Sequence, residues 1–361
     1  MIKKNNNKKN RYISYIKGLA FIAILIIHLC EWGGASSNII YTYFRKIFYP
    51  GLSILIFVSM SGSLIYLAYK DYDLKRASKR LIQRGFKLVG VYYLYSIIKL
   101  FIFNFNKEIF YGHFLSSNKL SSLVDILLLK NSDTGIPILF TIGIFLIISP
   151  ILLYFIRKAK NPNIPVIFAI LFFIVLSFIV SPTSSYIYNL LYSNNFAIFP
   201  LFLWIIPYLI GALIAINGFE KSKKTIFFTS FIGFTVYSIF FTINNMPINP
   251  AIYTYQLSNG SVKFYTYFVL FSFMIISILM YILEYVANMN NATINKILNI
   301  IEFIGDQTFD LYLIQWIVID ITYWIFSPKI WIIFITVLSA MFIYFFIKYK
   351  KQIKKEAILA E

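Results

Sequence analysis

Long apolar segments separated by short polar ones repeat along the whole chain. Each segment is close to the ~20 residues that a helix needs to cross a bilayer core of about 30 Å. The pattern predicts an all-α membrane protein, a bundle of about ten transmembrane helices. The predicted spans are residues 13–31, 50–69, 86–104, 136–156, 164–181, 197–217, 225–243, 264–286, 307–326 and 330–349. We expect residues 1–12 to form a basic, disordered tail, residues 13–349 the membrane domain, and residues 350–361 a cytoplasmic C-terminal tail.

The first span carries an unusual polar stripe. Lys17 and His28 are separated by about three helical turns, or roughly 16 Å, and therefore lie on nearly the same face of a helix. The sequence between them is apolar. An ionisable side chain inside a span is costly unless it faces the interior of the bundle, so His28 is a candidate functional residue.

Composition and charge support this topology. The 361 residues are 59% hydrophobic and only 13% charged, with a formal net charge of +19. Most Lys and Arg residues fall in alternate gaps between spans, which marks those gaps as cytoplasmic and places both termini inside. The positive charge is therefore a topology signal, and no nucleic acid is expected as a partner. Two histidines and one cysteine are too few for an obvious zinc site, so no metal is expected.

His28 lies near the outer end of the first span, and Glu31 follows one turn later. Imidazole moves protons near neutral pH, and a neighbouring carboxylate can orient the ring or stabilise imidazolium. These two residues are the candidate catalytic pair. The alternative is that His28 only forms a hydrogen bond within the bundle and that Glu31 is an ordinary interfacial acid.

A cluster of basic residues precedes the third span. Arg80, Arg84 and Lys87 share one face of a helix that leads into this span. Together with Lys17 they are candidates for holding the phosphates of a nucleotide-like cofactor. The alternatives are anionic lipid headgroups for the cluster and, for Lys17, an ammonium group that extends to the membrane surface.

Three further features lie within the predicted spans. Gln315 and Asp320 are unusual in the apolar ninth span, and Asp320 is an alternative acid partner for His28. Ser59, Gly62 and Ser63 form a small-residue face in the second span, which indicates close helix packing.

Several segments of the chain resemble the integral-membrane acyltransferase family 3. In residues 11–28 a basic residue, Lys17, is followed by ten residues and then a histidine, His28. The other segments are FVSMSGSLIY at 57–66, RGFK at 84–87, IPILFTIGIFLIISP from residue 136, and IGDQTFDLYLIQW at 304–316. The chain departs from the family pattern at Lys87, where a second arginine is expected, and at Gln315, where many members have a second histidine. It also departs from the family pattern at Gly90, where proline is common, and at Leu139, where the family tends to have tryptophan.

The resemblance implies transfer of an acyl group, usually acetyl, from cytoplasmic acetyl-CoA to a hydroxyl of a surface polysaccharide or lipid-linked glycan. It also implies a bacterial plasma membrane. Either His28 deprotonates the acceptor hydroxyl, or it first receives the acetyl group itself. The competing interpretation is a transporter or flippase for a lipid-linked glycan.

Overall fold

The structure is a computed structural model of the whole chain. It describes residues 2–32, 50–102, 119–129, 136–179, 201–246, 262–289, 291–326, 332 and 335–348. Within these ranges the chain forms helices with short connections and no strand, which confirms the all-α prediction. The helices are α1 (Ile2–Trp32), α3 (Pro50–Tyr69), α4 (Leu74–Ile102), α5 (Lys119–Leu127), α6 (Pro137–Lys158), α7 (Asn163–Ile179), α9 (Leu201–Asn217), α10 (Phe219–Ile243), α11 (Val262–Ala287), α12 (Ala292–Asp306) and α13 (Thr308–Phe326), followed by a helix over Ile335–Lys348.

Five of these helices are long and apolar enough to cross a membrane. They are Arg11–Cys30, Gly51–Tyr69, Pro137–Lys158, Phe219–Ile243 and Tyr265–Ala287. Three shorter apolar helices cover Asn163–Leu176, Leu201–Asn217 and Ile335–Lys348. Ten crossings and cytoplasmic termini stay predictions. Two helices, α5 and α12, lie where the sequence pattern predicted only connections between spans.

Local sequence explains where some helices begin and end. Pro137 stands in the first turn of α6, where its missing N–H is no loss. Arg157 and Lys158 lie in the last turn of α6, next to the negative end of the helix dipole. The Asn291 side chain caps α12 by accepting hydrogen bonds from the backbone N–H groups of Thr293 and Ile294, at 2.9 and 3.2 Å.

Glycines allow two pairs of helices, α3 with α9 and α4 with α6, to pack with their backbones in contact. A Cβ atom on Gly62 of α3 would lie 1.9 Å from the carbonyl oxygen of Tyr208, and one on Gly211 of α9 would lie 1.7 Å from that of Ser59. Gly85 of α4 and Gly143 of α6 face each other in the same way. Close approach through small residues is typical of membrane helices, and it confirms the packing role predicted for the small-residue face of α3.

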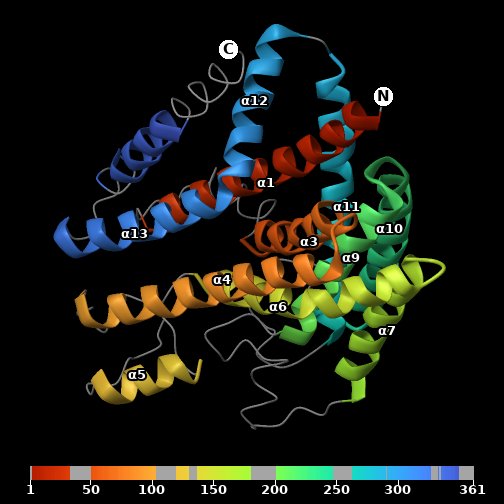
Figure 1. Cartoon of the computed structure of the whole chain (residues 1–361), viewed down its shortest axis with the longest axis horizontal. Coiled ribbons are helices and arrows are strands. Elements are labelled where there is room, and N and C mark those ends of the chain that lie inside the picture. The colour runs from red at the N-terminus through yellow and green to blue at the C-terminus, as the bar shows by residue number, and fades with distance from the viewer. Residues whose placement is uncertain are drawn as a thin grey trace.

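Helix α1 runs through the centre of the bundle (Figure 1) and contacts α3, α11, α12 and α13. Its central position explains why a polar side chain on α1 can be enclosed on several sides. Helices α4 and α6 lie side by side, away from α1 in this view.

Apolar side chains cover the outer surface of several helices. On α10, one exposed face is formed at spacings of three and four residues by Phe228, Ile232, Val236, Ile239 and Ile243. An exposed apolar face of this length would be a liability in water but is the ordinary surface of a protein in lipid. This face of α10 is typical of a membrane protein, and we expect it to contact lipid.

Candidate active site

His28 of α1 is buried against α13, a helix that is far away in the sequence. Only 8% of the residue is exposed. Its Nδ1 atom lies 2.5 Å from Nε2 of Gln315 on α13, at hydrogen-bond distance. The Trp316 ring lies beside the imidazole, with ring centroids 4.7 Å apart and planes tilted by 55°. One neighbour therefore fixes a ring nitrogen and the other fixes the orientation of the ring.

The Gln315 amide can serve either protonation state of the imidazole. In the structure its N–H group donates to Nδ1, which places the proton of the neutral ring on Nε2. Gln315 Oε1 is buried and has no hydrogen-bond partner among the described residues. Rotation of the amide by half a turn would let Oε1 accept a hydrogen bond from a protonated Nδ1. Gln315 can therefore support a ring that takes up and releases a proton.

Glu31 and Asp320 are the two acid partners predicted for His28. Glu31 belongs to α1, but its side chain lies outside the described residues. Asp320 is fully buried, and its contacts go to α4: Lys99 Nζ lies 3.3 Å from Oδ1, and the Tyr95 hydroxyl donates to Oδ2. The structure thus gives the His28 ring an amide partner and gives Asp320 a cationic one.

Lys99 is a residue that sequence reasoning missed. It lies within the predicted third span and is only 4% exposed. A lysine within an apolar segment was the available signal, because such a charge needs a partner. The partner itself, Asp320, is distant in sequence and could not be read from the pattern.

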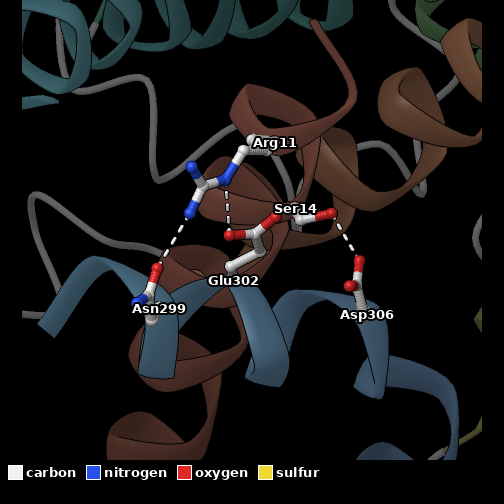
Figure 2. A network of polar contacts seen from close by, with 5 residues as sticks. All are labelled: Arg11, Ser14, Asn299, Glu302 and Asp306. Atoms are coloured by element: carbon white, nitrogen blue, oxygen red, sulfur yellow. Dashed lines mark hydrogen bonds and ion pairs between the residues drawn. The ribbon is translucent and has the colours of Figure 1, made fainter. Parts of the chain in front are cut away.

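Lys17 lies on the seam between α1 and α12, close enough to Asp306 for an attractive electrostatic interaction. Figure 2 shows polar contacts along the same seam. Arg11 donates hydrogen bonds to Glu302 and Asn299, both at 2.8 Å, and the Ser14 hydroxyl donates to Asp306 at 2.5 Å. Lys17 therefore has a carboxylate neighbour within the protein, which favours a role in helix packing over phosphate binding.

The predicted basic cluster is held by aromatic rings at the end of α3. The Arg84 guanidinium lies 6.0 Å from the centre of the Tyr69 ring, and Arg80 lies 5.0 Å from the centre of the Tyr72 ring. Arg157 of α6 joins them by donating a hydrogen bond to the carbonyl oxygen of Tyr69 at 2.5 Å. Sequence reasoning had not grouped Arg157 with Arg84. These contacts bring together an arginine cluster formed by Arg76, Arg80, Arg84 and Arg157.

The other candidate residues add little to this site. Lys87 is exposed on α4, on the same helix as Arg84. Asp310, at the start of α13, pairs with Lys348 and Tyr344 of the last helix. Within the ranges that the structure describes, no group of three His, Cys, Asp or Glu side chains could hold a metal ion.

Comparison with known families assigns the chain. The family model described as an acyltransferase domain matches residues 10–349. This chain belongs to acyltransferase family 3. Comparison with curated proteins and with solved structures gave no match. The match confirms the resemblance of the sequence motifs to this family and identifies the chain as an acyltransferase, rather than the transporter that was the competing interpretation.

Proposed function

We propose that this acyltransferase moves an acetyl group from acetyl-CoA to a hydroxyl of a cell-surface or lipid-linked polysaccharide, in a bacterial plasma membrane. The observation that carries the proposal is the enclosed imidazole of His28, bonded to Gln315 and packed on Trp316. A buried, oriented imidazole suits proton transfer from a hydroxyl nucleophile. Among the described residues it is the only histidine.

The arginine cluster supports acetyl-CoA as the donor. Guanidinium groups bind phosphate oxygens through paired hydrogen bonds, and a guanidinium that stacks on a tyrosine ring keeps its edge available for them. The guanidinium groups of Arg80 and Arg84 lie over tyrosine rings. In the proposal the cluster faces the cytoplasm and holds the phosphates, while the extended thiol-bearing arm reaches between the helices toward His28.

In the proposed reaction His28 acts as a general base. For this step the Gln315 amide is turned so that Oε1 accepts a hydrogen bond from Nδ1–H of His28, which leaves Nε2 unprotonated. The acceptor hydroxyl oxygen attacks the thioester carbonyl carbon, and its proton passes to Nε2 of His28. The carbon–sulfur bond then breaks, and the coenzyme A sulfur leaves and takes the proton from the imidazolium. The products are the acetyl ester and free coenzyme A. Gln315 holds Nδ1 throughout, and Glu31, one turn further along α1, is proposed to stabilise the imidazolium.

The test is the O-acetyl content of cell-surface polysaccharides, measured by proton NMR before and after mild alkali. Strains carry no copy, wild type, His28→Ala or Ile26→Ala at matched expression. Ile26 lies on the same helix, and its exposed apolar side chain makes it a matched control. We expect wild type and Ile26→Ala to restore alkali-labile acetate. We expect little or no alkali-labile acetate with His28→Ala, because loss of a general base lowers the rate about 10²- to 10⁴-fold.

Two results would contradict the proposal. Full activity of His28→Ala would remove this residue from the mechanism. Equal acetate in all strains would show that the acceptor or the acyl group is a different one.

A further inference from the structure

A second polar cluster lies further along α13, toward its C-terminal end, and links this helix to α4. Lys99 and Asp320 are 4% and 0% exposed, and their charged atoms are 3.3 Å apart. The Tyr95 hydroxyl donates a hydrogen bond to the same carboxylate. A single buried charge in a membrane helix is costly, so each of these charged groups depends on the other.

The cluster shares a helix with the neighbours of His28. Asp320 follows Trp316 by one helical turn and lies about 7 Å along the axis from Gln315. Gln315 and Trp316 meet His28 of α1, whereas Asp320 meets Lys99 and Tyr95 of α4. Beyond its exposed contacts with the last helix at Asp310, helix α13 is therefore held by buried polar contacts to two different helices.

These contacts can set the position of α13. Its main backbone contacts are with α1 and α12, and its link to α4 is made by side chains. Apolar packing in lipid tolerates small shifts in depth and rotation, but a hydrogen-bonded ion pair does not. A shift of α13 by one turn, about 5.4 Å, would separate Asp320 from Lys99 and Gln315 from His28 together.

We propose that Lys99, Asp320 and Tyr95 are positioning residues for acyl transfer. They fix the depth and rotation of α13, and so hold the Gln315 amide against Nδ1 of His28. The inference rests on the proposed role of His28 as a general base. It assigns Asp320 an indirect role through Gln315, instead of the direct contact with His28 that the sequence suggested.

The test uses inverted membrane vesicles from the native host, radiolabelled acetyl-CoA and the vesicles' own glycan as the acceptor. Initial rates of alkali-labile label give kcat and the KM for acetyl-CoA. We expect Asp320→Asn to lower kcat by up to about a hundredfold, the cost of an ångström-scale misplacement, with little change in KM. Asp320→Glu, which keeps the charge, should retain more activity than Asp320→Asn.

The decisive comparison is made on a Gln315→Ala background. If Asp320 acts through Gln315, adding Asp320→Asn to Gln315→Ala should lower kcat by less than about threefold further. A change of that size is close to the scatter within which the effects of independent mutations add. Independent, multiplying effects would overturn the proposal, as would wild-type kcat in Asp320→Asn. Asp310→Asn is the matched control, because it makes the same change on the same helix at a carboxylate that pairs with Lys348. It should leave kcat nearly unchanged.

A second variant covers the case in which Asp320→Asn does not fold. The double variant Lys99→Met/Asp320→Asn removes both charges and so leaves neither one uncompensated. We expect this double variant to be recovered in the membrane with a low kcat. Adding Gln315→Ala to it should change kcat very little. Wild-type kcat in this double variant would overturn the positioning role. The proposed function itself is tested separately by His28→Ala: if that variant is inactive while Asp320→Asn is normal, only the positioning role fails.

Discussion

The arginines of the cluster are positioned by tyrosine side chains and backbone. Arg80 and Arg76 lie over the ring of Tyr72, at 5.0 and 5.6 Å from its centre, and Arg84 lies over that of Tyr69. A cation–π contact holds a guanidinium in place without neutralising its charge. A set of such arginines retains its attraction for a phosphorylated ligand.

Replacement of Arg84 by alanine should weaken binding of acetyl-CoA. We expect the KM for acetyl-CoA to rise about tenfold or more, because one hydrogen-bonded charge contact is worth about 1.5–3 kcal/mol. The value of kcat should change little, because phosphate contacts lie far from the thioester and act in the ground and transition states alike. Initial rates in inverted vesicles over a range of acetyl-CoA concentrations measure both constants.

Lys221→Ala is the control for this variant. Lys221 is exposed on α10, and its replacement removes the same charge from a different helix. An unchanged KM in Arg84→Ala, or an equal rise in both variants, would contradict the phosphate-binding role of Arg84.

At the scale of elements, the backbones of α1, which carries His28, and α12 approach each other closely. A Cβ atom on Gly305 would lie 1.8 Å from the carbonyl oxygen of Ser14, and one on Gly18 would lie 2.2 Å from that of Ile301. The polar contacts of Arg11 and Ser14 lie along the same seam (Figure 2). Gly305 belongs to the segment at 304–316 that resembles a family motif, and the structure gives it a packing role.

Gly305→Ala should therefore separate α12 from α1. Backbone atoms cannot move aside as a flexible side chain can, so we expect a loss of stability of about 1–3 kcal/mol or more. The thermal unfolding midpoint of the purified protein, followed by loss of its monodisperse size-exclusion peak, measures the change.

Gly90→Ala provides the opposite expectation. An added Cβ atom there meets nothing within 4 Å, and the residue is inside α4. Alanine should leave the thermal unfolding midpoint unchanged or raise it, because alanine stabilises a helix by up to about 1 kcal/mol relative to glycine. A lower midpoint in Gly90→Ala than in Gly305→Ala would contradict the packing argument.

At the scale of the whole molecule, the exposed surface separates into apolar helix faces and basic connections. Helix α10 carries an exposed apolar face, whereas the start of α4 presents exposed basic side chains such as Lys79. This division is what the positive-inside rule requires of a membrane protein. It predicts that the start of α4 faces the cytoplasm.

Single cysteines on a Cys30→Ser background can test this orientation. A cysteine at Lys79 should react with a membrane-impermeant maleimide in inverted vesicles but not in intact cells. A cysteine at Ile232, on the lipid-facing side of α10, should react in neither. Labelling of the Lys79 position in intact cells would reverse the predicted topology.

Much of the fold was already readable from the sequence. Apolar segments of membrane-spanning length predicted helices where α1, α3, α6, α10 and α11 lie, because burial in lipid depends on the summed hydrophobicity of one local segment. The segment that became α12 was missed, since its polar residues do not favour the lipid core.

The candidate site was readable only in part. The sequence by itself determined that His28 is a polar residue within an apolar helix, that the chain is all-α, and that its motifs match acyltransferase family 3. The tertiary structure decided that Gln315 contacts His28, that Asp320 pairs with Lys99, and that Lys17 lies within electrostatic range of Asp306. The physical reason is that insertion is a local property of a segment, whereas side-chain pairing depends on the depth and rotation of helices hundreds of residues apart.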